Sequence, residues 1–434
     1  MTLPPGPRLP APIQTAVLLR SWPRAVAACR RRYGDIFTLR VASVGTIVYL
    51  ADRADIKTVF AGDPSVYHAG EANSMLRGIL GETSVLLVDD DVHRDRRRLM
   101  MAPFQRDPVA RLTPVMAGIA ATNIAGWPVG EQFEVHPRMS ALTLEVILRT
   151  VIGASDPARL AALREAMPRL LNLGPFAMLA VARPELQQRP PWRFLRRRLE
   201  AADALLYAEI AERRADADLA ERPDVLAMLV RAADADGRRM DDRELRDQLM
   251  TLLAAGHDTT ATALSWALER LTRNPAALDK AVQAARDGDD EYLDAVAKET
   301  LRIRPVVFDV GRKLTAPIDL HGYHLPAGVM VAPGIGLVHG DPALYDDPEA
   351  FNPDRMVGAT LSPTTWLPFG GGNRRCLGAG FAQAEMRVVL KEVLRRVELA
   401  TTTEPGERQK VRGVVLEPAR GGRITVRGRI TDLL

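Results

Sequence analysis

The sequence of 434 residues predicts a mainly α-helical fold with a small β-rich part, on three observations. Hydrophobic residues recur at helical spacing over most of the chain, and one such stretch, residues 241–273, is far longer than an average helix. Runs of β-branched residues predict strands within residues 37–52, within residues 306–333 and near the C-terminal end. No internal repeat or low-complexity linker divides the chain, so we expect residues 1–434 to form one domain.

The N-terminal part predicts an arm, a helix and a hairpin in that order. Residues 1–20 begin with the proline-rich MTLPPGPRLPAP and predict an extended arm. A helix is expected over residues 21–33 and a β-hairpin over FTLRVASVGTIVYLAD, residues 37–52. Helical spacing then dominates, and the helices expected next cover residues 91–101, 109–125, 141–152, 158–171, 192–214 and 224–235.

The helix expected over residues 241–273 organises the fold. Acidic residues at its start suit a helix N-terminus, and Asn274-Pro275 ends it. At 1.5 Å per residue it would be about 50 Å long, so it must pass through the middle of the molecule. After it we expect a helix over residues 290–304, strands and turns over 306–333, an irregular segment over 340–369, a helix over 379–396 and short final strands.

Composition and charge exclude several classes of function. The formal net charge is +4 and the arginines are interleaved with acidic residues, so no nucleic-acid-binding surface is expected. The first residues lack the ~20 apolar residues of a spanning helix, and no transmembrane anchor is expected. Two distant cysteines and no signal-peptide pattern favour a cytoplasmic protein without disulfides, which leaves the role of Cys29 open.

The stretch FGGGNRRCLG, residues 369–378, is the strongest local signal. Its three glycines let the backbone adopt positive φ and approach a flat, closely packed group. The helix that follows Cys376 directs unpaired N–H groups and its positive dipole end at the sulfur, which should lower the pKa of the thiol. A nucleophilic cysteine would need a nearby base and zinc would need more ligands, whereas haem iron needs one axial thiolate. A purely structural cysteine is the simpler alternative.

The pattern Phe369-x-x-Gly372-x-Arg374-x-Cys376-x-Gly378 resembles the haem-binding loop of the cytochrome P-450 superfamily, the haem-thiolate monooxygenases. The resemblance implies the cytochrome P-450 fold, with a long central helix over haem b (iron protoporphyrin IX). It makes Cys376 the proximal iron ligand and Arg374 a partner of a haem propionate. It places Phe369 beside the sulfur and lets Gly372 and Gly378 permit the tight loop.

The middle of the longest helix carries AAGHDTT, a cluster of poor helix formers between apolar runs. A solvated polar face is the simpler explanation, but a threonine bonded to the carbonyl one turn back and a glycine can open a groove beside a cofactor. The stretch is similar to the family's oxygen-activating motif, with Ala255 and Gly256 along the cofactor. The resemblance assigns Thr259 to stabilise bound dioxygen and Asp258 to supply protons through Thr259 and water. His257 is expected to be structural.

KETLRIRP places Glu299 and Arg302 at i and i+3 of a helix. Such pairs are common on exposed helices and contribute little there. In the family the pair is buried and joined by an arginine from a downstream loop, which FNPDR supplies as Arg355. The resemblance therefore implies a triad that supports folding and the haem loop.

Two further cationic sites fit the resemblance. His93 and Arg97 lie at i and i+4 in VHRDRRRL, and Arg312 lies in DVGRKL. A solvated arginine-rich helix is the alternative for the first pair. By resemblance, His93 and Arg97 bind one haem propionate and Arg312 the other, for which the planar guanidinium is suited.

The family also implies a hydrophobic substrate, such as a lipid, sterol, terpene or polyketide. Its contacts are expected in residues 66–84, 171–179 and 306–310 and at the turn 414–415. Ordinary core packing explains many of these residues equally well. The candidate substrate contacts are Leu76, Ile79, Leu80, Phe176, Met178, Val306, Val307 and Phe308.

The reaction implied is the insertion of one oxygen atom of O2 into this substrate. Because the sequence carries no flavin, iron–sulfur or dinucleotide motif, we expect electrons from a ferredoxin or flavodoxin with its reductase. An acidic partner would dock on the thiolate side against Arg375 and some of Arg94, Arg96 and Arg98.

Other haem-thiolate functions are the alternatives. A peroxide-driven peroxygenase would need no reductase. A haem-thiolate isomerase or dehydratase, and a haem-based sensor or carrier, would need no acid–alcohol pair, so Asp258 and Thr259 argue against them.

Overall fold

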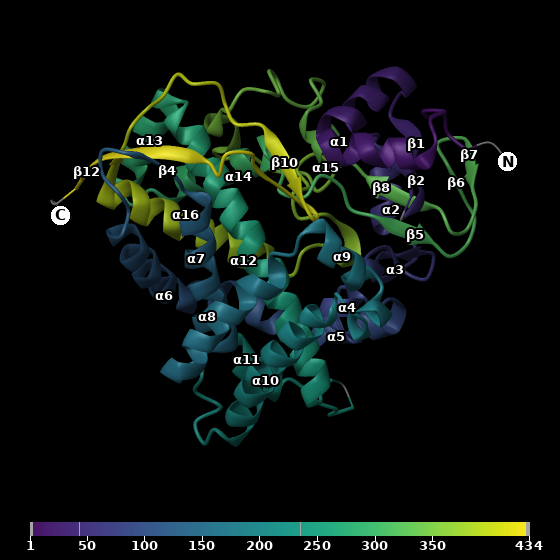
Figure 1. The fold of residues 1–434 in the computed structure, drawn as a ribbon. Coiled ribbons are helices and arrows are strands. Elements are labelled where there is room, and N and C mark those ends of the chain that lie inside the picture. Colours follow the sequence, from purple (N-terminus) through teal and green to yellow (C-terminus); the bar gives the residue numbers. More distant parts are fainter. Residues whose placement is uncertain (1–2, 43, 235, 431–434) are drawn as a thin grey trace.

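The computed structural model describes residues 3–42, 44–234 and 236–430. Its central element is α12 (Asp242–Thr272), which crosses the molecule between the outer helices (Figure 1). Asp241 accepts a hydrogen bond from the N–H of Glu244, whose carboxylate accepts one from the N–H of Asp241, so a capping box starts the helix. Nearly all of residues 244–251 and 260–272 are buried, as a helix surrounded by others requires.

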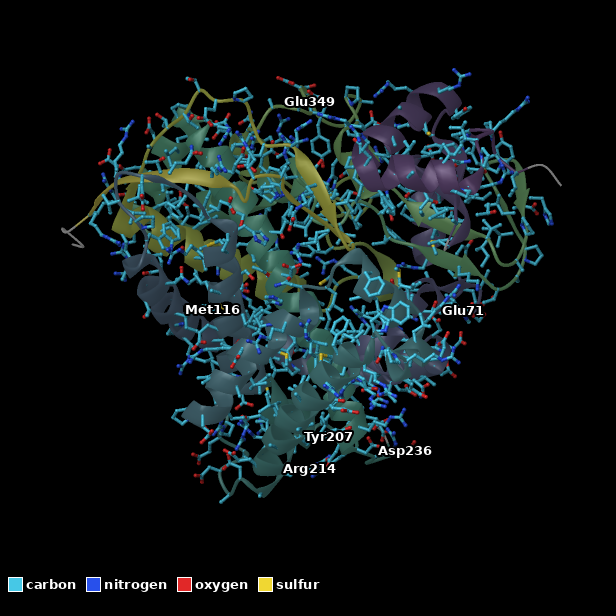
Figure 2. The ribbon with its side chains drawn as sticks, viewed as in Figure 1. Glu71, Met116, Tyr207, Arg214, Asp236 and Glu349 are labelled. Atoms are coloured by element: carbon cyan, nitrogen blue, oxygen red, sulfur yellow. The ribbon has the colours of Figure 1, made fainter. Side chains whose placement is uncertain are left out.

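Helices form most of the body around α12, and α10 lies at the lower edge, where Figure 2 labels Tyr207 and Arg214. α7 packs along α12, and α6 packs against α16. The longer helices are α1 (Ala11–Tyr33), α5 (Asp90–Met101), α6 (Arg106–Ala125), α7 (His136–Ile147), α8 (Pro157–Leu171), α10 (Arg193–Ala215), α13 (Pro275–Asp287), α14 (Asp290–Ile303) and α16 (Ala379–Arg396). The shorter ones are α2 (Arg53–Ala61), α3 (Ala69–Ala72), α4 (Arg77–Leu80), α9 (Pro175–Ala182), α11 (Val225–Arg231) and α15 (Ile335–His339).

The β-rich part lies beside α1 at the upper right of Figure 1. Its five-stranded sheet has the order β1-β2-β8-β5-β3, and β2 and β8 are its parallel pair. These strands are β1 (Ile36–Val41), β2 (Gly45–Leu50), β3 (Tyr67–His68), β5 (Arg312–Leu314) and β8 (Met330–Pro333). The small sheets comprise β6 (Ile318–Leu320) with β7 (Tyr323–Leu325), β10 (Gln409–Arg412) with β11 (Val415–Pro418), and β4 (Gln132–Glu134), β12 (Arg423–Arg429) and β9 (Val397–Leu399).

Three apolar clusters hold these parts together. The largest fills the space between the helices and includes the buried Met100, Met116 and Trp127. A second lies between the five-stranded sheet, α2 and α15, and a third between α1 and the outer face of β1 and β2. Within the described ranges, we find no helix that is both long and apolar enough to span a bilayer.

Several element boundaries differ from the sequence-based expectations. α1 begins at Ala11 and continues through a kink at Ser21, so the predicted extended arm over residues 1–20 is wrong for residues 11–20. The helix expected over residues 224–235 ends at Arg231, and residue 235 lies outside the described residues. Helix α2, whose N-cap is Asp52, and helix α13 were not predicted. Pro275 reads as the stop signal after α12 but occupies the first turn of α13.

Candidate active site

The cysteine loop, residues 366–378, is held closed by its own backbone. The N–H of Cys376 donates to the carbonyl of Phe369 at 2.9 Å. Gly372 has a φ of +66°, and a Cβ atom there would lie 2.1 Å from the carbonyl oxygen of Phe60, so both conformation and space require glycine. Gly378 has a φ of −84°, and a Cβ atom there would meet no other atom within 4 Å. Among the described residues, backbone conformation and packing therefore require glycine at position 372 but not at position 378.

Aromatic packing fixes the loop to the helical body. The rings of Phe369 and Trp366 meet edge to face at 5.9 Å between centroids. Trp366 donates its indole N–H to the carbonyl of Lys298 on α14 at 3.1 Å. Trp366 was not among the predicted site residues, although an aromatic residue shortly before the glycine run is a recognisable signal.

Cys376 has solvent-exposed surface, but protein atoms surround its sulfur on most sides. Burial raises the pKa of the free thiol, and the N–H of Gly378, Arg375 and Arg97 oppose this only in part. The start of α16 thus lowers the pKa through the N–H of Gly378, as expected, but burial outweighs it and the net shift of the free thiol is upward. A bound metal ion would supply the charge needed to stabilise the thiolate.

Four basic side chains converge beside the cysteine loop. Burial and the charges of Arg374, Arg97 and Arg312 lower the pKa of His93 to about 3. Burial also lowers the pKa of Arg97, which lies close enough to Cys376 for the two charges to interact. The cluster joins α5, β5 and the loop and forms a site suited to anionic groups.

The arginines of this cluster differ in their protein contacts. Arg374 forms an ion pair with Asp89 and donates to the carbonyl of Val88 at 2.7 Å. The guanidinium predicted to bind a propionate is thus already paired within the protein. Arg312 is buried over the ring of Phe60, at 5.9 Å from its centroid, and burial lowers the pKa of Arg312 to about 10.

The AAGHDTT stretch interrupts the burial of α12. Ala255 is exposed, and its neighbours Ala254 and Gly256 are half-buried, between the buried residues 244–251 and 260–272, so this turn borders an open space. The hydroxyl of Thr259 donates to the carbonyl of Ala255 at 2.7 Å. The Asp258 carboxylate pairs with Arg412 at 2.5 Å, a contact that the sequence did not predict. His257 is buried, with Nδ1 at 3.0 Å from the carbonyl of Leu253, which fits a structural residue.

Gly256 is half-buried next to this turn. A Cβ atom there would lie 2.9 Å from Cδ1 of Ile147 on α7. Glycine at this position therefore allows α7 to pack closely on α12, and its role beside a cofactor stays a prediction.

The structure brings Glu299, Arg302 and Arg355 together in the interior. The Glu299 carboxylate accepts from Nε and Nη2 of Arg302, both at 2.7 Å, and from Nε of Arg355 at 3.1 Å. Arg302 also donates to the carbonyls of residues 339, 348 and 350, which ties α14 to the segment before the cysteine loop.

The candidate substrate contacts separate into three groups. Ile79, Leu80 and Val306 are buried in the main cluster, against which Leu76 and Met178 pack, and Val307 is half-buried. Phe176 is 57% exposed and stacks on Trp192. Phe308 belongs instead to the cluster between α1 and the sheet, where its ring packs on Gly336, so its assignment to the substrate is wrong.

Comparison with known proteins decides the family. The model of the family described as Cytochrome P450 matches residues 4–425. The chain belongs to the cytochrome P450 family. It is 70% identical to the Mycobacterium tuberculosis protein named "Putative cytochrome P450 135B1", over 98% of this chain and 92% of the relative. It is 40% identical to cytochrome P450 135A1 of the same organism, named in the same way, over 97% and 94%.

The fold of this cytochrome P450 agrees with a solved structure of the family. A cyanobacterial protein described as retinoic acid bound CYP120A1 superimposes with a TM-score of 0.84, over 99% of this chain and all of the other, at 24% identity. The family makes the chain an oxidoreductase, a haem-thiolate monooxygenase that uses O2 and a redox partner.

The residues present fit a haem with a thiolate ligand. A single accessible cysteine lies in a glycine-rich loop, a Cβ atom on Gly378 would meet only open space, and a cationic cluster adjoins the sulfur. One soft ligand and positive charge for two carboxylates are what a haem requires of its protein.

Proposed function

We propose that this cytochrome P450 inserts one oxygen atom of O2 into a hydrophobic small molecule, and that the Cys376 thiolate would hold the iron of haem b. The observation that carries the proposal is the cysteine loop, in which glycine geometry and the Phe369 carbonyl present one accessible sulfur beside Arg97. When bound, the haem supplies reduction of O2 and cleavage of the O–O bond. The reaction consumes the substrate, O2, two electrons and two protons and yields the hydroxylated product and water.

In this proposal the basic cluster binds the two haem propionates. Arg97, His93 and Arg312 supply the contacts, because Arg374 is already paired with Asp89. Neutral His93 can donate an N–H, and the arginines keep their charge at neutral pH. Arg374 instead forms an ion pair with Asp89, and this pair fixes the cysteine loop to the start of α5.

Thr259 and Asp258 have the proton-handling roles. The Thr259 hydroxyl donates to Ala255, so its lone pairs are free to accept a hydrogen bond from water on the open side of α12. Asp258 takes a proton from solvent and passes it towards Thr259. A T259A variant should consume electrons at a similar rate but release hydrogen peroxide in place of product.

Apolar side chains around the open turn of α12 favour a hydrophobic substrate such as a lipid, sterol, terpene or polyketide. α4 contacts both α12 and α9, so residues of these segments can border one space. The contacts proposed here are Leu76, Ile79, Leu80, Met178, Val306 and Val307, with Phe176 at the outer edge. A compound screen that follows the haem Soret band would identify binders.

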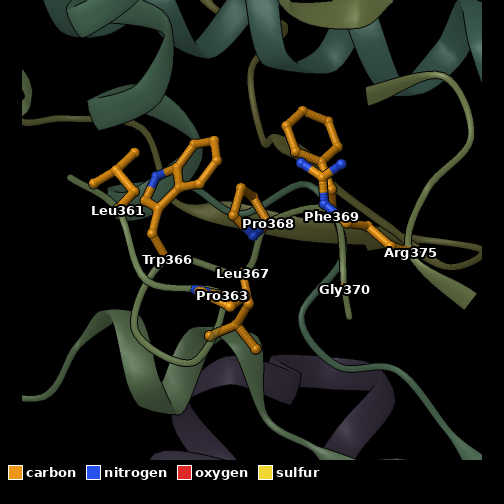
Figure 3. A pocket seen from close by; sticks show the side chains of 8 residues that line it. All are labelled: Leu361, Pro363, Trp366, Leu367, Pro368, Phe369, Gly370 and Arg375. Atoms are coloured by element: carbon orange, nitrogen blue, oxygen red, sulfur yellow. The ribbon is translucent and has the colours of Figure 1, made fainter. Parts of the chain in front are cut away.

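We propose a ferredoxin or flavodoxin, with its reductase, as electron donor. Beside the cysteine loop lies a hollow of about 220 Å³ (Figure 3), lined by Leu361, Pro363, Trp366, Leu367, Pro368, Phe369, Gly370 and Arg375. Exposed Arg375 can attract an acidic partner. Arg94 and Arg98 are also exposed, whereas Arg96 is buried against Glu244 and is excluded from this surface.

Two experiments test the proposed function. Product from NADPH, ferredoxin and reductase, compared with product from hydrogen peroxide alone, separates the monooxygenase from the peroxygenase. Reduction of the ferric enzyme at low salt should be at least about fivefold slower in R375E than in wild type, because surface charges act on association. R197E on α10, where Arg197 is exposed but outside the hollow, is the control. An equal rate in R375E and R197E would reject the docking surface.

We also propose a cytoplasmic location. A free thiol must persist at Cys376 until haem binds, and a reducing compartment preserves it.

A further inference from the structure

The carboxylate of Asp258 is held by a residue far away in the sequence. Its Oδ1 atom accepts from Nη2 of Arg412 at 2.5 Å, and 154 positions separate the two residues. The Asp258 side chain is 13% exposed and that of Arg412 27%, so the pair lies just below the surface. At this depth an ion pair is screened less than on the surface.

Arg412 uses all three nitrogens of its guanidinium. Besides its bond to Asp258, Nε donates to Glu417 across the β10–β11 hairpin, and Nη1 donates to Oδ1 of Asn172 at 3.1 Å. Asn172 directly follows α8. Burial lowers the pKa of Arg412, but Asp258 and Glu417 outweigh it and the net shift is upward. The guanidinium is therefore charged and fixed in orientation.

The hairpin that carries Arg412 is itself fixed to α12. The carbonyl of Leu416 accepts from the indole N–H of Trp266 at 2.8 Å, and its N–H donates to the carbonyl of Val306 at 2.8 Å. Figure 1 shows β10 descending towards α9, in line with the contact to Asn172. Arg412 thus has a defined position relative to the turn that contains Asp258 and Thr259.

We propose that Arg412 is a positioning residue for proton delivery, which holds the Asp258 carboxylate in one orientation so that protons pass from solvent through this group to Thr259. The proposal rests on the monooxygenase function proposed above. For each proton delivered, the Asp258 carboxylate accepts a proton from solvent and releases one towards Thr259. The bound guanidinium limits the rotamers of the carboxylate.

Other titratable groups also face this pair. His136 on α7 and His257 on α12 are close enough for their charges to interact with Asp258, and burial lowers the pKa of both. Both histidines are therefore neutral at neutral pH. Glu417 on β11 forms an ion pair with Arg412. Lys410, on the same strand as Arg412, lies 3.5 Å from Glu417, and no contact with Asp258 is seen among the described residues. K410Q is therefore a matched control for loss of one positive charge from the hairpin.

The test compares R412Q, R412K, D258N, the R412Q/D258N double variant and K410Q as haem-loaded enzymes. R412Q should lower kcat about tenfold at saturating substrate, leave the substrate Kd unchanged and increase the solvent isotope effect. R412K should recover part of kcat, and K410Q should equal wild type. Infrared spectra of the resting enzyme supply a readout independent of turnover. The carboxylate band that disappears in D258N should shift and broaden in R412Q, because the carboxylate then lacks its fixed partner.

The double variant separates positioning from simple structural support. If Arg412 acts through Asp258, R412Q/D258N has the kcat of D258N alone. The proposal is overturned if adding R412Q to D258N lowers kcat by the same factor as R412Q does in the wild type. It is also overturned if R412Q and K410Q have the same kcat. A D258N enzyme with the wild-type kcat would instead reject the proton relay in the proposed function, and this proposal with it.

Discussion

Removal of the Glu299 carboxylate should cause the largest loss of stability of any single substitution in the triad. Glu299 and Arg302 are fully buried, and the carboxylate accepts four hydrogen bonds, from two nitrogens of Arg302, from Arg355 and from the N–H of Asn352. E299A would leave two guanidinium groups without their carboxylate, one of them in the interior. Breaking a buried pair in this way costs about 3–5 kcal/mol. For 434 residues the unfolding entropy near the midpoint is about 0.9 kcal/mol/K, so Tm should fall by about 3–6 °C.

Thermal unfolding followed by far-ultraviolet circular dichroism measures this loss. The control is E200A, because Glu200 forms an exposed pair with Arg196 on α10, with side chains 64% and 49% exposed. An exposed pair contributes about 0–1 kcal/mol, so E200A should lower Tm by no more than about 1 °C. If E299A and E200A unfolded within 1 °C of each other, the buried ion pair would not support the fold as argued here.

Two further predictions follow from other buried groups. Burial raises the pKa of Asp309 to about 6, above its value of about 3.9 in an unfolded chain. Between these values the native state keeps a proton that the unfolded state releases, so Asp309 destabilises the protein increasingly as pH rises from about 4 to 6. The Tm of D309N relative to wild type should therefore be higher at pH 8 than at pH 4, and a pH-independent difference would contradict the assignment. G372A combines an unfavourable φ with a clash against Phe60, so we expect it to lower Tm by several degrees in apoprotein melts, while G378A should not. Equal melting of the two variants would show that the loop tolerates a side chain at Gly372.

Local patterns in the sequence predicted most of the helices and the contacts within them. The i, i+3 spacing of Glu299 and Arg302 places them on one helical face, and the structure shows the ion pair. The glycine-rich stretch before Cys376 likewise predicted a loop with positive φ, which Gly370 and Gly372 adopt. These features depend on residues a few positions apart, where backbone geometry alone limits the outcome.

Contacts between segments that lie far apart in the sequence could not be predicted from local patterns. The partners of Arg374 and Asp258 are Asp89 and Arg412, from other elements. The sequence likewise does not show that α7 packs against the Gly256 face of α12. Such pairings follow from tertiary packing, in which many polar residues could serve as partners.

The ferrous carbonyl spectrum tests the central claim, that the Cys376 thiolate binds haem iron, most directly. We expect freshly prepared wild-type protein to show the red-shifted Soret band of a thiolate-ligated haem, and C376H to show the band of a histidine-ligated one. A histidine-type band in undenatured wild type, or a thiolate-type band that persists in C376H, would contradict the assignment.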